Sequence, residues 1–216
     1  MTVRSWMIAL PSTAIRTGAA ISGLLLVFFT LVHLGGLIPA VLAPAQFEAY
    51  ASSLHASPWL SPLEIGLSLV AVVHVSLTIT KAIANRAAGN IAQLSSRRHA
   101  PLAALASRSK AIAGLLTLTF LVIHLNQLRW PRPLAGHEGA MLRSLLQQPF
   151  NTFIYVAAAI VLTLHLIHGT EAAHRSLGWL SPTNGFAIRT GGRLLAAVIG
   201  GGFLLISLAL AFGVNA

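Results

Sequence analysis

Five apolar stretches joined by short polar connections constrain this chain more than any other feature. Each holds the roughly 20 mostly apolar residues that a helix needs to cross a bilayer. The expected spans are about Thr17–Leu42, Pro62–Ile83, Ala111–Leu128, Phe150–Ala172 and Leu194–Val214. Hydrophobic residues make up 56% of the 216 positions and charged residues only 8%, as is typical of integral membrane proteins. The sequence therefore predicts an all-α bundle of five transmembrane helices in one domain, 1–216.

The basic residues are divided unevenly among the connections and predict the orientation. Three of the fourteen, Arg129, Arg132 and Arg143, lie in the third connection. The other eleven are Arg4, Arg16, Lys81, Arg86, Arg97, Arg98, Arg108, Lys110, Arg175, Arg189 and Arg193. Because Lys and Arg are enriched in cytoplasmic connections, the N-terminus is expected in the cytoplasm and the C-terminus outside. The first sixteen residues are expected to form a cytoplasmic leader. Because these cations flank apolar runs instead of forming one patch, nucleic-acid binding is not expected.

Four histidines lie within the apolar stretches in a doubled pattern. His33 and His124 are 91 residues apart, and so are His74 and His165. An ionisable side chain inside a membrane span is costly and marks a functional site by default. A single such histidine is also explained by a hydrogen bond between helices, but four in matched register favour two metals, each bound by two imidazoles.

The local sequences around two of these histidines repeat as well. The segment SGLLLVFFTLVHL (22–34) resembles AGLLTLTFLVIHL (113–125), with Gly ten residues and Phe four residues before each histidine. Chance similarity of leucine-rich helices explains the leucines but not the shared histidine spacing. We expect an internal two-fold repeat, in which residues about 16–89 (helices 1–2) correspond to about 108–180 (helices 3–4), followed by a fifth helix.

The depth of each histidine in the membrane predicts how they pair. His33 follows Arg16 by 17 residues and His124 follows Lys110 by 14, which places both in the outer half. His74 and His165 precede Lys81 and Arg175 by seven and ten residues, which places both in the inner half. Given the helical rise, the outer and inner pairs should lie on the order of 10–15 Å apart along the membrane normal.

Two facing histidines at one depth in a helix bundle suit a haem iron with both axial positions filled. Such a haem carries electrons and does not readily bind substrate. The chain has no cysteine, which excludes cysteine-held iron–sulfur clusters and covalently attached c-type haem. Three glycines, Gly23, Gly114 and Gly169, suit either a close approach of the cofactor or simple helix packing. His168, three residues after His165, is an alternative ligand or a hydrogen-bonding neighbour.

With these motifs, the chain resembles the membrane-anchor cytochrome b subunit of succinate dehydrogenase/fumarate reductase, in its single-subunit, five-helix, two-haem form. The resemblance rests on G-x9-H at Gly23–His33 and Gly114–His124, on H-x3-G at His165–Gly169 with Gly178, and on FEAYASSLHASPW (47–59). It covers nearly the whole chain. It implies that the axial ligands of the two haem b groups are His33, His74, His124 and His165.

The resemblance also implies the partners and the electron path. A flavoprotein subunit with FAD and an iron–sulfur subunit would dock on the cytoplasmic face of a bacterial inner membrane. Electrons would pass through the inner and then the outer haem to a membrane quinone, with menaquinone expected, or in reverse for fumarate reduction. This chain carries no dicarboxylate or FAD motif, so its own chemistry would be limited to the quinone.

Quinone reduction consumes two protons, and His55 with Glu48 are the candidate proton groups. Some relatives have an acid near the position of His55, and a water-facing loop histidine and acid remain the alternative. Glu64 suits a helix N-terminal or interfacial role, and Glu171 is placed to pair with Arg175. Candidates for binding haem propionates are Arg16, Lys81, Arg108, Lys110, Arg143 and Arg175, with interfacial anchoring as the alternative.

Two other functions remain open at this level. One is the cytochrome b subunit of another respiratory enzyme, such as a hydrogenase or formate dehydrogenase. The other is a haem-free, proton-coupled transporter that uses the histidines as relays.

Overall fold

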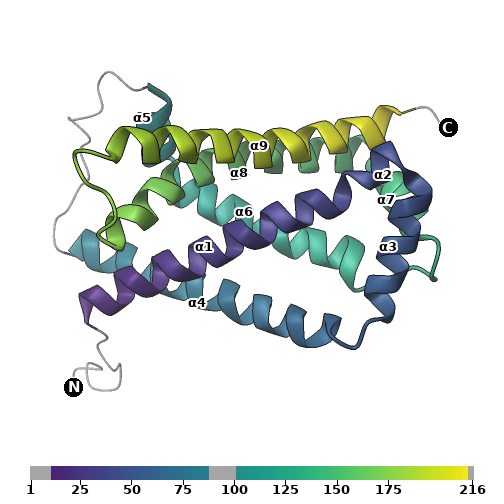
Figure 1. Ribbon diagram of the computed structural model, residues 1–216, viewed down its shortest axis with the longest axis horizontal. Helices are drawn as coiled ribbons and strands as arrows, with labels where there is room; N and C mark the ends of the chain where they lie inside the picture. Colours follow the sequence, from purple (N-terminus) through teal and green to yellow (C-terminus); the bar gives the residue numbers. More distant parts are fainter. Residues whose placement is uncertain (1–10, 88–100, 214–216) are drawn as a thin grey trace.

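The computed structural model describes residues 11–87 and 101–213, and every regular element among them is helical (Figure 1). Arg4, Arg97 and Arg98, which entered the charge argument, and most of the expected leader lie outside these ranges. Five helical stretches are long and apolar enough to cross a membrane. They are α1 (Ser12–Leu37) with α2 (Pro39–Leu42), α4 (Leu60–Ala87), α6 (Lys110–His124) with the π-helix η2 (Leu125–Arg129), α8 (Pro149–Ser176) and α9 (Gly185–Phe212).

The first four expected spans agree with these helices to within five residues, but the fifth begins nine residues before its expected start at Leu194. Arg189 and Arg193, assigned to a connection, instead lie in the first turns of α9. Hydropathy marks only the apolar part of a helix, and arginine side chains extend from the helix toward the polar region. The helix begins after a turn in which the Asn184 side chain accepts a hydrogen bond from the Ser181 amide and donates one to the Trp179 carbonyl.

Small residues allow the long helices to pack closely. The tightest pair is α8 and α9, where a Cβ on Gly200 would lie only 1.8 Å from Thr163 Oγ1. Helix α1 packs on α4, and α6 packs on α8, while α1 also contacts α8 and α9. Within a membrane, close approach at glycine is a main source of helix association, because lipid removes the hydrophobic drive. These contacts place α1, α4, α6 and α8 around a common interior.

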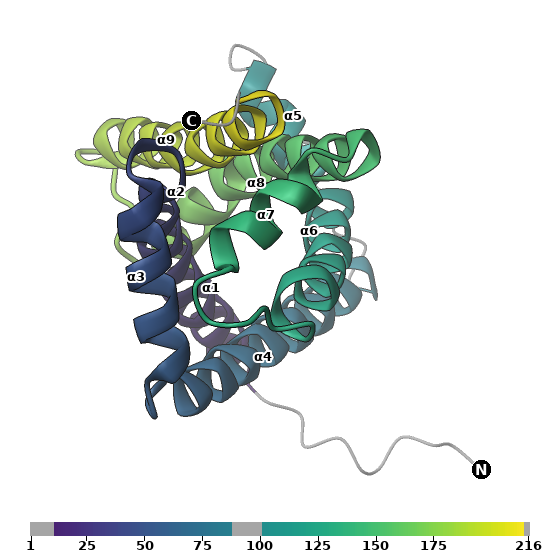
Figure 2. The same ribbon diagram turned by 90° about the vertical axis from the view of Figure 1, so that its right-hand side faces the viewer.

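Shorter helices close the two ends of the bundle. At one end, α3 (Pro44–Ala56) and α7 (Glu138–Leu146) lie across the long helices, and we call this the cap end (Figures 1 and 2). A buried cluster of apolar side chains joins the cap to the bundle. It consists of Ala40, Phe47, Ala51, Leu142, Leu146, Tyr155 and Leu210. At the opposite end, which we call the base end, α5 (Pro101–Arg108) packs on α8.

Candidate functional site

Near the cap end, His33 of α1 and His124 at the end of α6 face each other. Their ring centres are 6.0 Å apart, and the ring planes are nearly perpendicular at 78°. Aromatic rings surround both. Phe29 stacks on His33 at 5.6 Å and Phe203 of α9 lies 5.9 Å from it, while Phe120 lies 5.7 Å from His124. The surroundings of this cap-end pair are thus largely apolar.

One polar side chain reaches the cap-end pair. The Tyr155 hydroxyl of α8 lies 3.3 Å from Nδ1 of His124. A tyrosine hydroxyl both donates and accepts, so the direction of this hydrogen bond depends on the imidazole tautomer. The sequence analysis did not find Tyr155. The only available signal was a polar group in an apolar stretch, which occurs at many positions without a role.

Nearer the base end, His74 of α4 and His165 of α8 form the second pair, with ring centres 6.5 Å apart at an angle of 83°. Nδ1 of His74 lies 3.2 Å from the Ala19 carbonyl oxygen and 3.3 Å from the Ser22 hydroxyl. A carbonyl oxygen only accepts, so this contact requires the hydrogen on Nδ1. In that tautomer, Nε2 of His74 carries the free lone pair and is available to a ligand.

These are the two pairings that the depth argument predicts. A bond from a metal to an imidazole nitrogen is about 2.0 Å, so two imidazoles on opposite sides of one metal have ring centres about 6 Å apart. Both observed spacings are close to this value. Elsewhere in residues 11–87 and 101–213, no group of three or more His, Cys, Asp or Glu side chains is placed to hold a metal ion.

Two of the three singled-out glycines lie beside histidine rings. A Cβ on Gly23 would lie 2.9 Å from Cε1 of His74, and a Cβ on Gly114 would lie 3.6 Å from Cε1 of His165. Around Gly169, by contrast, an added Cβ would meet nothing within 4 Å. Gly23 therefore allows the His74 ring to approach the backbone more closely than a Cβ would permit, whereas the space at Gly114 would also hold a Cβ.

His168 lies one turn after His165 on α8 and is half-buried. It is His165 whose ring faces His74. The geometry thus brings the residue favoured by the 91-residue register into the pair.

Four cations of the predicted set come together at the base end. Arg16, Lys110 and Arg175 are near enough to Lys81 to act on its charge, so the start of α1, the end of α4, the start of α6 and the end of α8 each contribute one. Arg175 also donates to Glu171 at 2.6 Å, which confirms the predicted pair.

The other two members of that set lie at opposite ends of the bundle. Arg108 is exposed at the end of α5, and Arg143 is half-buried on α7 at the cap end. Arg143 is therefore at the opposite end from the four base-end cations, whereas Arg108 lies at the same end, two residues before Lys110.

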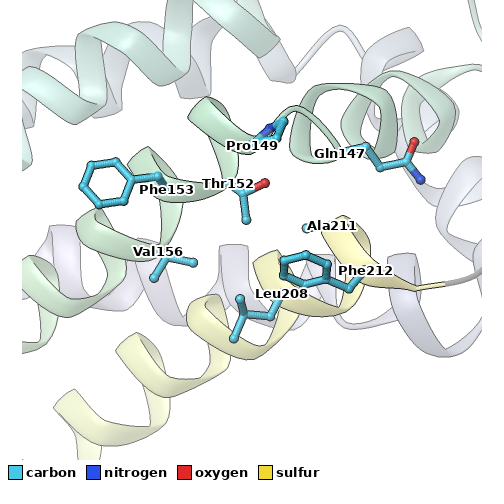
Figure 3. Close-up of a pocket in the computed structure, with 8 residues that line it drawn as sticks. All are labelled: Gln147, Pro149, Thr152, Phe153, Val156, Leu208, Ala211 and Phe212. Carbon is cyan, nitrogen blue, oxygen red and sulfur yellow. The ribbon is translucent and has the colours of Figure 1, made fainter.

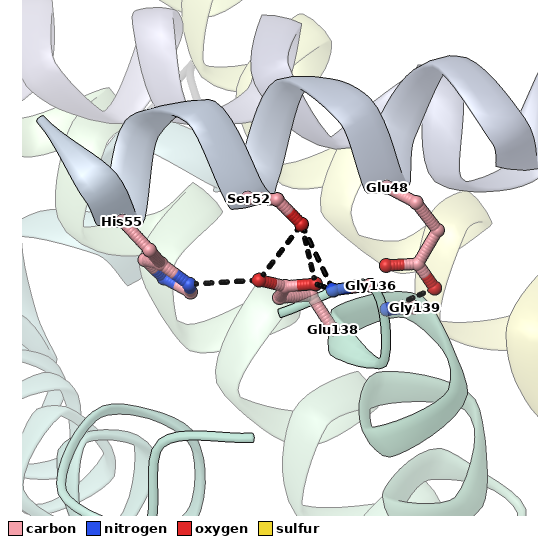
Figure 4. A network of polar contacts seen from close by, with 6 residues as sticks. All are labelled: Glu48, Ser52, His55, Gly136, Glu138 and Gly139. Atoms are coloured by element: carbon pink, nitrogen blue, oxygen red, sulfur yellow. Dashed lines mark hydrogen bonds and ion pairs between the residues drawn. The ribbon is translucent and has the colours of Figure 1, made fainter. Parts of the chain in front are cut away.

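The cap contains a buried carboxylate that the sequence analysis did not single out. Glu138 of α7 accepts hydrogen bonds from Ser52 at 3.1 Å and from the Gly136 amide at 2.8 Å, and His55 Nδ1 lies 3.1 Å away (Figure 4). Burial raises the pKa of Glu138, but the hydrogen bonds to its carboxylate outweigh this and lower the pKa to about 2. Its side chain is only 5% exposed.

His55 and Glu48, the two candidate proton groups, therefore do not form one unit. His55 pairs with Glu138, whereas Glu48, seven residues earlier on the same helix, accepts a hydrogen bond at 2.9 Å from the Gly139 amide (Figure 4). Both residues lie on α3 and not in a loop, and they are partly buried against α7 and the segment before it, with 33% of the His55 side chain exposed. His55 and Glu138 are 83 positions apart in the sequence, which hid this pair from sequence analysis.

Glu64 has ion-pair partners that the sequence analysis did not identify. It forms an ion pair with Arg129 in η2 and lies 3.7 Å from Arg132, so it ties the cap end of α4 to the end of the third span. Glu64 lies four residues after the start of α4, and its expected helix-end or interfacial role stays a prediction beside this ion pair.

An apolar groove of about 310 Å³ lies between the start of α8 and the end of α9 (Figure 3). It is lined by Gln147, Pro149, Thr152, Phe153, Val156, Leu208, Ala211 and Phe212, and so by none of the four paired histidines.

A comparison of the chain with protein families, curated proteins and solved structures found no significant match.

Proposed function

We propose that this chain is a membrane cytochrome b that binds two haems, one between each histidine pair. We further propose that it serves as the electron-carrying anchor of a succinate:quinone oxidoreductase. The observation that carries the proposal is the pairing of four intramembrane histidines at ring-centre spacings of 6.0 and 6.5 Å. These spacings suit one metal between each pair.

The choice of haem over a bare metal ion rests on coordination. Two imidazoles occupy only two positions of a metal, and no third side chain of suitable type is grouped with them within the described ranges. A porphyrin supplies four nitrogen ligands and leaves two axial positions, which is what a histidine pair can fill. The hydrogen bond of His74 to the Ala19 carbonyl supports the same reading, because it leaves Nε2 free to bind a metal.

The interior also supports a flat cofactor. Leu60 is the buried residue of α4 and Ala113 that of α6, and all four histidines keep some accessible surface. Side chains of this chain thus bury little of the helices that carry His74 and His124. At the base end, Arg16, Lys81, Lys110 and Arg175 offer four positive charges to the carboxylates of a haem.

Matched contacts support the proposed two-fold repeat. Phe29 and Phe120 each lie against the histidine four residues later. Gly23 and Gly114 each lie beside the histidine 51 residues later.

The distribution of basic residues supports an orientation in the membrane. Arg129, Arg132 and Arg143 of the third connection belong to the cap end, and the other Lys and Arg residues that the structure describes lie toward the base end. We therefore place the base end in the cytoplasm.

When bound, the haems would supply reversible one-electron chemistry. The protein's contribution would be to hold each iron by two imidazoles, which leaves no open position for substrate, and to surround it with apolar side chains. The base-end pair would receive electrons from an iron–sulfur partner, and the cap-end pair would exchange them with a quinone. His55 and Glu138 at the cap would be the nearest candidates to move the protons that quinone chemistry requires.

The decisive experiment is to purify the full chain from a membrane and to measure haem by absorbance and extraction. We expect two b-type haems per chain, both reducible by dithionite. A preparation without reducible b-type absorbance and without extractable haem would refute the cytochrome and favour the proton-coupled transporter.

Co-purification then distinguishes the type of cytochrome. Under mild detergent, we expect a flavoprotein with covalent or tightly bound FAD and an iron–sulfur protein, together with succinate-dependent haem reduction. A partner that contains nickel or molybdenum would instead assign the chain to a hydrogenase or formate dehydrogenase.

A further inference from the structure

Tyr155 is buried at the junction between the cap and the cap-end histidines. Its side chain is 8% exposed, and it belongs to the apolar cluster that includes Phe47 of α3 and Leu142 of α7. Its ring meets Phe120 edge-on at 5.0 Å, and its hydroxyl is 3.3 Å from Nδ1 of His124. The rings of α6 and the cap therefore hold the phenol in place beside one imidazole.

The hydrogen bond has two directions with different consequences. If the hydroxyl donates to Nδ1, the hydrogen of the neutral imidazole is on Nε2, and that nitrogen cannot bind a metal. If Nδ1–H donates to the hydroxyl oxygen, Nε2 is free to bind and the imidazole becomes a stronger electron donor. Only the second arrangement is compatible with ligation through Nε2.

We propose that Tyr155 is the positioning residue of the cap-end pair: its hydroxyl oxygen accepts from Nδ1–H of His124, selects the ligating tautomer and lowers the redox potential of that site. This inference rests on the proposed function. The other imidazole of the pair, His33, is held by the rings of Phe29 and Phe203. Tyr155 thus controls the electron-donor strength of His124, while His33 is positioned by apolar contacts.

The test is a redox titration of the purified chain with Tyr155→Phe, which keeps the ring and removes the hydroxyl. The two tyrosines of the chain provide a matched control, because Tyr50 is 46% exposed on α3. In Tyr155→Phe, we expect one haem component to change its preference for ferric over ferrous iron by up to tenfold, an upward shift of up to about 59 mV for one electron. The other component, and both components of Tyr50→Phe, should keep their potentials.

A second variant avoids any loss of packing. In a Tyr50→Phe background, incorporation of 3-fluorotyrosine labels only position 155 in this chain and weakens the acceptor without removing it. The same component should shift in the same direction by a smaller amount. Unchanged potentials in both experiments, with two haems bound, would overturn the role of Tyr155 and leave the proposed function intact.

If the wild-type chain binds no haem, the proposed function fails, and the tautomer is then measured by nitrogen-15 NMR of the histidine-labelled chain. The Nδ1 signal that His124→Ala removes should move in Tyr155→Phe and not in Tyr50→Phe. A signal that stays in place would overturn the proposed hydrogen bond.

Discussion

The two histidine pairs have nearly the same ring spacing but are held by different means. In the base-end pair, His74 contacts the backbone carbonyl of Ala19 and lies beside Gly23, both on a regular helix. In the cap-end pair, His124 ends an α-helix, a π-helix follows at Leu125, and its polar contact is the Tyr155 side chain. Backbone groups of α1 therefore hold His74 in the first pair, whereas side chains from four helices, α1, α6, α8 and α9, surround the second. A π-helix is often found next to functional sites.

The largest expected effect tests the pairing itself. His33→Ala and His124→Ala should each remove the same haem component, and His74→Ala and His165→Ala should each remove the other, because each iron would lose one of two axial ligands. Reduced-minus-oxidised spectra of the four purified variants measure this. Loss of one common component in His74→Ala and His124→Ala would contradict the pairing.

Two further histidines serve as controls for that series. His137→Ala changes an exposed position next to α7 and should leave two haems. His168→Ala should also leave two, because His165 faces His74. Loss of one haem in His168→Ala would transfer the ligand assignment to it.

The next effect tests whether the close approach of the His74 ring to the backbone at Gly23 matters. A Cβ in Gly23→Ala would meet the His74 ring at 2.9 Å, closer than real contacts allow, whereas Gly114→Ala would make an ordinary contact at 3.6 Å with His165. We expect Gly23→Ala to destabilise the site by about 1–3 kcal/mol. In haem titrations, it should weaken the base-end component only, and Gly114→Ala should retain both. Equal haem affinities in Gly23→Ala and Gly114→Ala would contradict the prediction that the close contact between Gly23 and the His74 ring matters.

A smaller effect concerns the stability of the cap and not the histidine pairs. Because the pKa of Glu138 in the folded protein is about 2, below its ordinary value of 4.5, its carboxylate stabilises the cap above about pH 4.5. This contribution should be lost as the pH falls from 4.5 to 2. Glu138→Gln should lower cap stability by about 1–3 kcal/mol at neutral pH and flatten the dependence in that window.

Limited proteolysis of the segment between η2 and α7, measured across this pH range, tests the Glu138 prediction. Glu48→Gln is the matched control on α3, because Glu48 accepts from Gly139 and does not contact His55 in the network. A wild-type cap whose cleavage rate is constant from pH 5 to pH 2.5 would contradict the assigned pKa.

The smallest effect compares the polar neighbours of the two pairs. Ser22 already donates to the Gly18 carbonyl at 2.7 Å, and the Ala19 carbonyl remains as the acceptor for His74 when the hydroxyl is removed. Ser22→Ala should therefore shift the base-end potential by less than Tyr155→Phe shifts the cap-end one. A larger shift of the redox potential in Ser22→Ala than in Tyr155→Phe would contradict the view that the backbone positions His74 and a side chain positions His124.

The sequence by itself determined the long helices and the partners within each histidine pair. Helical rise and the positions of flanking cations place a histidine at a depth, and two histidines at one depth lie near each other when both face the interior of the bundle. The Glu171–Arg175 pair was predictable for the same reason, since residues four apart on a helix are neighbours. The start of α9 was not, because hydropathy reports the apolar core of a helix and not its polar ends.

Only the tertiary structure decided what surrounds each histidine. Tyr155 reaches His124 because α8 packs against α6, and Glu138 reaches His55 because α7 packs across α3. Contacts between residues far apart in sequence depend on how helices rotate and cross, and no local periodicity encodes this. The composition and register of the chain thus specify a membrane bundle with two histidine pairs, while the packing of α1 on α4 sets the hydrogen bond of His74 and the packing of α8 on α6 sets that of His124.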